Sequence, residues 1–410
     1  MNIHNNVPTH WKIKKISDVL FFQEGPGVRK WQFHDSGVKL LNVGNINHGR
    51  IDLSSTKIHL SEEQAYGKYS HFLIDDGDLL IACSGIVVSN FHNKIAFVRK
   101  KHLPLCLNTS TMRFKVLDSH TIDLNYYRYF LQTRHFTGQL RKYITGSAQL
   151  NFGPSHIKKI DLILPPLAEQ QKIAAILDAA DQLRQKDQQL IDHYTTLSQS
   201  LFLEMFGDPV VNQQKFEKGT IRDLVSSVKY GTSSKAQTDG TYPYLRMNNI
   251  TYEGEMDFTS LKYIDLSEKD KPKYLVRKGD ILFNRTNSKE LVGKTGIINN
   301  DKAMALAGYL IRVRTNEKAN PYFIWGYLNS KHGKLVLKHM CKSIVGMANI
   351  NAQELQNIKV VLPPITLQNQ FAQHIEKIEQ QKQQAQASLE KSEALFNSLL
   401  QRAFKGELTS

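Results

Sequence analysis

An internal duplication is the feature that most constrains how this chain can fold. The segment Ile160–Pro166 (IDLILPP) matches Ile358–Pro364 (IKVVLPP) at a shift of 198 residues, and Gly77–Ile81 matches Gly279–Phe283 at a shift of 202. Further identities at the shift of 198 pair Asn151 with Asn349 and Gln170 with Gln368. A repeated unit of about 200 residues exceeds the periods of roughly 20 to 50 residues that build solenoids. The sequence therefore predicts two copies of one module.

Each copy closes with a Leu-Pro-Pro segment that predicts a long helix. Neither Gly nor Pro occurs from Leu167 to Phe206 or from Ile365 to Lys405, and helix-favouring residues dominate both stretches. Apolar residues recur at spacings of three and four, which is typical of a helix with a narrow seam for a partner. The seam predicted for the first helix comprises Ile173, Ile176, Ala180, Leu183, Leu190, Tyr194, Leu197 and Leu201.

We expect these two helices to pair with each other. Equivalent segments of a duplicated chain can meet about a pseudo-two-fold axis, and the pair is then antiparallel. Polar residues interrupt both seams, among them Asp187 and Lys382. If these two face each other, apolar positions meet apolar positions along the seam, and a buried polar pair can set the register.

The segments that precede the helices combine strand and helix signals. Strand-like runs bounded by Gly, Asn and Asp lie at residues 38–43, 78–81, 94–98, 280–283 and 308–313. Helical stretches follow at Asn125–Arg141 and Pro321–His339. The predicted fold class is α+β, with two tandem mixed domains that are separated and followed by long helices. The predicted boundaries are residues 1–163 for the first domain, 164–206 for the central helix, 207–361 for the second domain and 362–410 for the distal helix and tail.

The positive charge of the chain lies in the two domains. The formal net charge is +15, and residues 1–163 and 207–361 each carry an excess of +9. Two equally basic bodies favour double-stranded nucleic acid contacted at two places, whereas a membrane-binding chain would concentrate its charge in one tail or helix. Apolar runs too short for a bilayer, a polar N-terminus and three widely separated cysteines predict a reduced cytoplasmic protein.

Catalytic motifs are missing from the sequence. No Asp/Glu-x-Lys triplet of a metal-dependent nuclease occurs, and both Pro-Pro pairs lack the flanking residues of an amino-methyltransferase. Gly293-Lys294-Thr295 resembles the end of a phosphate-binding loop, but Ser288 replaces its first glycine. The histidines form no metal-binding pair on a helix. We therefore expect binding without chemistry, and neither a metal nor a cofactor in this chain.

Basic and amide side chains in the two domains are candidate DNA contacts. Phosphates attract Lys and Arg, whereas Arg reads guanine and Asn reads adenine. The candidates in the first domain are Arg29, Lys30, Trp31, Arg99, Lys100, Lys101, Arg141 and Lys142. Those in the second are Arg246, Asn248, Asn249, Asn284, Arg285, Asn287, Lys338 and Lys342. We favour Arg246, Asn248 and Arg285, because loops after short strands can project into a groove.

The order of these features resembles the specificity subunit of a type I restriction-modification system. Two basic domains each precede a Leu-Pro-Pro helix, with Leu203–Pro209 (LEMFGDP) closing the first copy and Leu399–Leu408 (LLQRAFKGEL) ending the chain. The resemblance covers essentially the whole chain. One departure is that the family often has Arg after Gly-Asp-Ile-Leu. Here Asn284-Arg285 follows in the second copy, but Ala82-Cys83 in the first.

The resemblance implies two target recognition domains, each reading one half of a split DNA sequence. It also implies that the antiparallel helices dock two modification subunits, which methylate adenine with S-adenosylmethionine. Two restriction subunits complete such a complex and cleave DNA after ATP-driven translocation, so S-adenosylmethionine, ATP and Mg belong to the partners. The specificity subunit itself carries no catalytic site.

Two other classes of protein remain open from the residues alone. The chain could be a single-chain pseudo-symmetric nuclease or recombinase with an unrecognised active site, in which case it would cut DNA in the presence of magnesium. It could also be an architectural protein that only bridges DNA, in which case it would bind no methyltransferase subunit.

Overall fold

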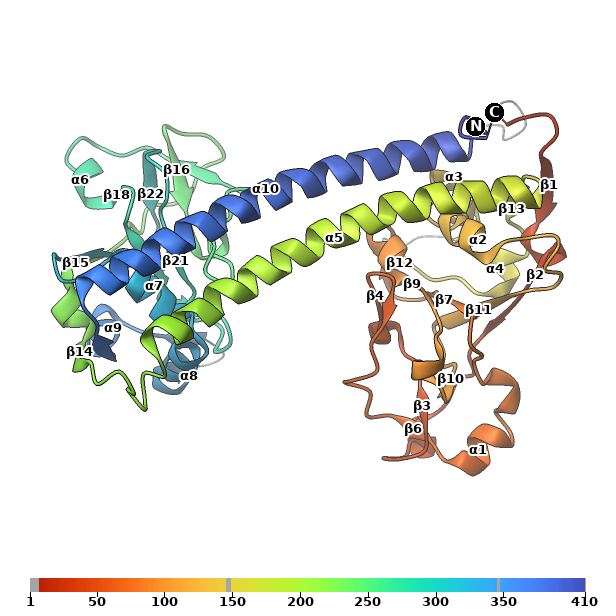
Figure 1. Cartoon of the computed structure of the whole chain (residues 1–410), viewed down its shortest axis with the longest axis horizontal. Coiled ribbons are helices and arrows are strands. Elements are labelled where there is room, and N and C mark those ends of the chain that lie inside the picture. Colours follow the sequence, from red (N-terminus) through yellow and green to blue (C-terminus); the bar gives the residue numbers. More distant parts are fainter. Residues whose placement is uncertain (1–6, 145–148, 345–346, 410) are drawn as a thin grey trace. The chain divides into compact units, whose positions relative to one another are not determined.

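The computed structural model describes residues 7–144, 149–344 and 347–409, and it divides into two compact units. Unit 1 comprises residues 1–185 and 389–410, and unit 2 comprises residues 186–388. Each unit contains one mixed domain and one part of each of the two long helices, α5 (Leu167–Phe206) and α10 (Ile365–Ala403) (Figure 1). The α+β class predicted from the sequence is confirmed.

Unit 1 is built on a four-stranded antiparallel sheet. Its strands follow the order β2 (Leu20–Glu24), β11 (Thr111–Val116), β7 (Leu79–Ala82) and β9 (Ile95–Phe97). One face packs on helix α2 (Leu124–Phe130), where the rings of Phe114 and Tyr127 lie 5.1 Å apart. On the other face Leu80 joins a second cluster with Leu41 and Leu105. The sheet is therefore buried on both faces.

Smaller elements complete unit 1. They are β1 (Lys12–Lys15), β3 (Val38–Leu40), β4 (Ile46–Asn47), β5 (Arg50–Ile51), β6 (His59–Leu60), β8 (Ile86–Val87), β10 (Leu105–Cys106), β12 (Gln149–Leu150), β13 (Asp161–Leu164), α1 (Glu62–Tyr66), α3 (Arg134–Tyr143) and α4 (Pro154–Ile157). Strands β10, β3 and β6 form a second sheet in that order.

Unit 2 repeats this architecture. Its central sheet has the order β15 (Val225–Tyr230), β23 (Leu310–Thr315), β19 (Ile281–Asn284) and β21 (Thr295–Ile297), again antiparallel throughout. On one face Phe283 clusters with Phe323, and on the other Leu282 clusters with Leu245. The duplicated sequence therefore folds into two sheets of the same order.

Smaller elements complete unit 2 as well. They are β14 (Glu217–Thr220), β16 (Tyr242–Leu245), β17 (Lys262–Ile264), β18 (Leu275–Val276), β20 (Thr286–Asn287), β22 (Met304–Leu306), β24 (Lys342–Ile344), β25 (Met347–Asn349), β26 (Lys359–Leu362), α6 (Lys271–Tyr274), α7 (Pro321–Asn329), α8 (Lys331–Met340) and α9 (Ala352–Gln356). Strands β20, β25 and β24 form a small sheet in that order.

Each helical stretch predicted inside a domain is two helices. The break between α2 and α3 lies at Thr133, whose hydroxyl accepts a hydrogen bond from the Phe136 amide at 3.1 Å. Ser330 caps α8 in the same way, at 3.0 Å from the Gly333 amide. A capping hydroxyl satisfies amides that an uninterrupted helix would bond to carbonyls, so these residues start a new helix.

A buried glutamine attaches each long helix to its domain. Gln170 is fully buried; it accepts a hydrogen bond from the Asp123 amide at 2.9 Å and donates to the carbonyls of Thr121 and Pro165. Gln368 makes the equivalent bonds in unit 2, to Asn320, Lys318 and Pro363. Each amide joins the Pro-Pro entry of the helix to the start of the domain helix beside it.

The two long helices run antiparallel within each unit. In unit 1 the Arg184 guanidinium lies 4.0 Å from the centre of the Phe396 ring. Nearer the N-terminus of α5, the Glu169 carboxylate accepts a hydrogen bond from the Thr409 side chain. In unit 2 Thr195 contacts Lys382, and Phe202 packs on Phe371 with ring centres 5.7 Å apart. As residue numbers rise along α5 they fall along α10, so the predicted antiparallel pairing is confirmed.

The register predicted for this pair is wrong. Lys382 contacts Thr195, which lies eight positions along α5 from its expected partner Asp187. Three leucines of the predicted seam, Leu183, Leu190 and Leu197, are 38 to 49 % exposed. Lys382 also pairs with Glu255 of the second domain, so a contact outside the helix pair helps to fix its position. Such contacts are invisible to a comparison of the two helices alone.

Within the described residues, no helix is both long enough and apolar enough to cross a membrane.

Candidate nucleic-acid interface

A buried asparagine holds the same tight turn in both units. In unit 2 the Asn249 side chain, 1 % exposed, accepts a hydrogen bond from the Arg246 amide at 2.9 Å and donates to the Asp257 carbonyl at 2.9 Å. In unit 1 Asn45 accepts from the Asn42 amide at 2.8 Å and donates to the Asp52 carbonyl at 2.8 Å. The turn therefore has a fixed shape in both domains.

A lysine side chain is hydrogen-bonded to the backbone of each of these turns. Lys294 Nζ donates to the Met247 carbonyl at 2.7 Å, and Lys94 Nζ donates to the Val43 carbonyl at 3.2 Å. Burial lowers the pKa of both lysines. The lysine of Gly293-Lys294-Thr295 therefore has a structural role. Lys294 is only 8 % exposed, and its ammonium group is hydrogen-bonded to a backbone carbonyl.

The turn in unit 2 presents two of the favoured candidates. Asn248 is exposed and Arg246 is half-buried, with its guanidinium 3.1 Å from the Ser260 carbonyl. Asn249 is buried, and its amide shapes the turn through the hydrogen bonds given above. The turn lies beside the second candidate segment of this unit, since Lys294 also accepts a hydrogen bond from the Asn284 amide through its carbonyl, at 2.8 Å.

The segment after β19 presents Arg285 and Asn287, both partly exposed. The Arg285 guanidinium lies 4.8 Å from the centre of the Tyr230 ring, and its Nη2 is 3.5 Å from Asn349 Oδ1. Asn284 is fully buried, and its side-chain oxygen accepts from the Thr286 amide. The structure thus places the loop of Arg246 and Asn248 beside the segment of Arg285 and Asn287. The buried Asn249 and Asn284 support these two segments.

In unit 1 a rigid turn presents Arg29, Lys30 and Trp31. All three side chains are exposed, and Trp31 has 79 % of its surface accessible. Beneath them the buried Gln32 side chain accepts from the Arg29 amide at 3.1 Å and donates to the Tyr69 hydroxyl at 2.8 Å. A large exposed aromatic ring on an anchored turn, directly after two cations, can stack on a nucleic acid base.

The other basic candidates lie on exposed surface. Arg99, Lys100 and Lys101 form a short turn, and burial, followed by the charges of Lys101 and Arg99, lowers the pKa of the adjoining His102. Arg141 and Lys142 end α3, and Lys338 lies near the end of α8, the corresponding helix of unit 2. Lys342 begins β24, but its side chain lies outside the described residues.

Aromatic and amide side chains that the sequence did not single out lie beside these candidates. Tyr230 and Tyr309, which are 42 and 55 % exposed, flank Arg285, and Asn349 contacts it. Asn151 is exposed at the equivalent place in unit 1. The identity of Asn151 and Asn349 in the repeat was a usable signal, whereas nothing in the sequence places either tyrosine beside an arginine.

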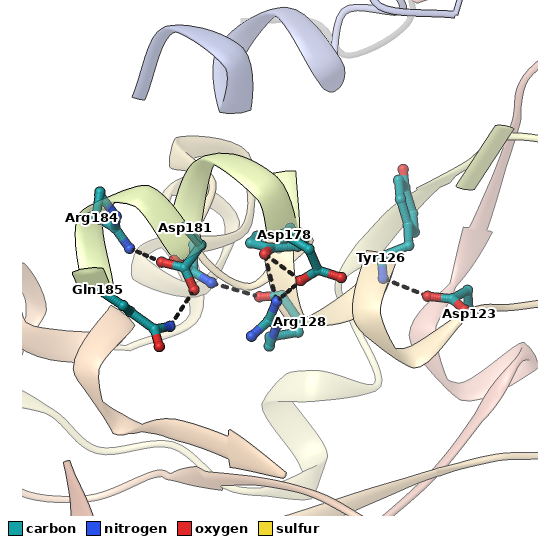
Figure 2. A network of polar contacts seen from close by, with 9 residues as sticks. Asp123, Tyr126, Arg128, Asp178, Asp181, Arg184 and Gln185 are labelled. Carbon is teal, nitrogen blue, oxygen red and sulfur yellow. Dashed lines mark hydrogen bonds and ion pairs between the residues drawn. The ribbon is translucent and has the colours of Figure 1, made fainter. Parts of the chain in front are cut away.

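A polar network fixes the first domain on α5 (Figure 2). Arg128 of α2 pairs with Asp178 of α5, and the Tyr129 hydroxyl donates to the same carboxylate at 2.7 Å. Burial and this carboxylate raise the pKa of Tyr129. Further along α5, Asp181 accepts from Arg184 and from Gln185. Asp178 therefore joins the domain to the helix, whereas these bonds of Asp181 lie within α5.

No cluster of three or more His, Cys, Asp or Glu side chains that could hold a metal ion occurs in the part of the chain that the structure describes.

The two halves of the chain match the same family model. A model described as type I restriction modification DNA specificity domain matches residues 8–192 and again residues 213–391. The EcoKI specificity subunit of the type I restriction enzyme from Escherichia coli K12 is 23 % identical, and the alignment covers 98 % of this chain and 90 % of that protein. The StySPI specificity subunit from Salmonella potsdam is 22 % identical over the same shares.

A solved structure has the same fold. The crystal structure of the type I restriction-modification S subunit from M. genitalium superposes with a TM-score of 0.55 at 16 % identity, covering 98 % of each chain. With the duplicated sheets, the antiparallel helices and two matches to one family model, the chain belongs to the family of type I restriction-modification DNA specificity subunits.

Proposed function

We propose that each domain of this specificity subunit binds one half of a split double-stranded DNA target, with the domains bounded at residues 1–163 and 207–361. The observation that carries the proposal is the duplication itself. Two sheets of the same strand order each support an anchored turn and exposed basic side chains, and each domain carries an excess charge of +9. Two similar basic domains suit two stretches of one polyanion.

The candidate contacts divide by exposure and chemistry. We assign phosphate contacts to the exposed cations Arg29, Lys30, Arg99, Lys100, Lys101, Arg141, Lys142 and Lys338, together with Lys342. We assign base contacts to Arg246, Asn248, Arg285 and Asn287, because these groups match the edges of guanine and adenine in the major groove. Asn249 and Asn284, which are buried, support the loops that present them.

The long helices would dock two methyltransferase subunits, and two restriction subunits would complete the assembly in the cytoplasm. Leu183, Leu190 and Leu197 recur every seven residues on α5, so they lie along one side of this helix. Exposed leucines at heptad spacing suit a partner helix. S-adenosylmethionine, ATP and Mg would be bound by the partner subunits, and this chain would perform no catalysis.

Methylation mapping tests the DNA half of this proposal. A host that carries the chain and its partner subunits should show one split motif with a methyladenine in each half. Exchange of residues 1–163 for the same domain of a relative should change one half of the motif only. A motif that changes in both halves would show that the domains do not act independently.

Co-purification tests the docking half. In unit 2 the variant L190S/L197S should reduce capture of the methyltransferase subunit at least tenfold, because two apolar contacts are lost on one face. Leu117 is equally apolar and 59 % exposed, but it lies in a loop of the first domain, so L117S serves as the matched control. Equal capture by both variants would exclude the leucine row as the docking surface.

A further inference from the structure

Equivalent positions in the two central sheets can be matched by their backbone hydrogen bonds. Strand β2 ends at Glu24 and β15 ends at Tyr230, each opposite the second residue of the neighbouring strand. The residue after β7 is Cys83, whose amide donates to the Ser110 carbonyl at 2.8 Å. The residue after β19 is Arg285, whose amide donates to the Tyr309 carbonyl at 3.0 Å.

The carbonyl groups of Cys83 and Arg285 also make matching hydrogen bonds. The Cys83 carbonyl accepts from the Phe152 amide at 2.9 Å, and the Arg285 carbonyl accepts from the Ile350 amide at 2.9 Å. Asn151 and Asn349 immediately precede these two amides and contact Ser84 and Thr286, respectively. The backbone frame is therefore the same, and the side chains Glu24, Cys83 and Ser110 in unit 1 replace Tyr230, Arg285 and Tyr309 in unit 2.

In unit 2 this frame holds a cation in place. The Tyr230 hydroxyl accepts from the Ala352 amide at 2.9 Å, which fixes the ring on which the Arg285 guanidinium lies. The only side-chain hydrogen bond of Arg285 among the described residues is a long one, 3.5 Å to Asn349, and its Nε has no partner there. Among the described residues, no ion pair joins Arg285 to a carboxylate. The guanidinium N–H groups of Arg285 are therefore held in place, and most of them make no hydrogen bond to the described residues.

In unit 1 the same frame holds an anion. Glu24 Oε1 lies 3.8 Å from the thiol of Cys83, which is fully buried. A side-chain carbon added at Gly153 would approach Glu24 Oε2 to 3.0 Å, so the glycine leaves room for the carboxylate. Burial and the nearby Glu24 raise the pKa of Cys83, so the thiol keeps its proton. No described cation pairs with Glu24, whose acceptors are mostly unused.

We propose that Arg285 and Glu24, which lie at neighbouring positions of the same backbone frame, each read a base of their half-target and do so with opposite hydrogen-bond polarity. Arg285 donates to O6 and N7 of a guanine in the second half-target, and Glu24 accepts from the exocyclic amino group of a cytosine in the first. These are the pairings that the two side chains favour at base edges. The inference rests on the proposed function, since it requires that each domain binds one half of the target.

The test is methylation mapping in a host that expresses the full chain with its methyltransferase partner. The variant R285Q should lose discrimination at one guanine position in the second half only, by roughly 5- to 150-fold. E24Q should relax one cytosine position in the first half only. R222Q and E62Q, which alter exposed charges elsewhere in the same two units, are the matched controls and should leave the motif unchanged.

R285K separates base reading from phosphate binding. Lysine keeps the charge but lacks the planar fork, so it should keep phosphate binding and lose part of the guanine discrimination. Methylation that weakens at all sites with an unchanged motif would overturn the proposal, because Arg285 would then be a phosphate contact. A second half-target without guanine, or E24Q with an unchanged first half, would also overturn it. Absence of any split motif for the unaltered chain would instead contradict the proposed function.

Discussion

The ammonium group of Lys382 lies 2.6 Å from the hydroxyl oxygen of Thr195, so a cation that is 4 % exposed joins α10 to α5. The same ammonium pairs with Glu255, which belongs to the loop after the Asn249 turn. Burial raises the pKa of Glu379, on the same helix, although the charge of Lys382 opposes this shift. One side chain thus connects both helices and the second domain.

Removal of this cation should destabilise the protein. K382M leaves the Glu255 carboxylate without its partner, so we expect a loss of about 1 to 3 kcal/mol in the free energy of unfolding, measured by urea denaturation. The expected loss in the free energy of unfolding is smaller than for a fully buried ion pair, because Glu255 is about one-third exposed. The double variant K382M/E255Q should recover part of it. If K382M unfolds no earlier than the exposed-surface variant K377M, the pair does not contribute.

The buried glutamines make a second prediction about stability. Q170A removes one acceptor and two donors that are bonded to backbone groups, and the partners left unpaired should cost about 1 to 3 kcal/mol. Q182A, at an exposed position on the same helix, should change stability by less than about 0.5 kcal/mol. Thermal unfolding of the two variants under one condition decides whether the amide anchors α5; equal midpoints would refute that role.

Trp31 allows a direct optical test of DNA contact. The chain has three tryptophans, and Trp11 and Trp325 are only 6 and 7 % exposed. Iodide should therefore quench mainly Trp31 fluorescence, and W31F should abolish this quenching. Target DNA should protect the fluorescence of the unaltered protein from iodide, because a ring in contact with DNA is shielded from solvent. Quenching that DNA leaves unchanged would remove Trp31 from the interface.

Lys334 predicts a pH dependence of stability. Burial lowers its pKa from 10.5 to about 8, and its ammonium donates to the Tyr252 carbonyl at 2.9 Å. Below pH 8 the folded and unfolded states both carry the proton, and folding bears the full cost of burying the charge. Between pH 8 and 10.5 only the unfolded state binds the proton, so stability rises with pH.

The comparison of variants isolates this effect. The free energy of unfolding of the unaltered protein, relative to K334M, should increase from pH 8 to pH 10. K338M alters an exposed lysine on the same helix and should show no such trend relative to the unaltered protein. A difference between the unaltered protein and K334M that stays constant over this range would mean that the pKa of Lys334 is not lowered by folding.

Several features of the fold could be predicted from the sequence because they depend on neighbours along the chain. The absence of Gly and Pro after each Leu-Pro-Pro segment predicted helices that begin and end within two residues of α5 and α10. The repeat predicted two domains of one architecture, and the motif order predicted the family. Identities at fixed shifts report common descent of the two halves, and that information survives without any knowledge of contacts.

The register of the helices and the exposure of the candidate residues depended on contacts between distant segments. Leu183, Leu190 and Leu197 have the spacing of a seam, yet they are exposed because domain contacts turn another face of α5 inward. Asn248 and Asn249 are identical neighbours in sequence, but only Asn249 is buried, since backbone groups of residues 257 and 260 surround it. The sequence by itself determined the modules and their chemistry. The tertiary structure decided which side chains are exposed, because burial depends on what packs nearby.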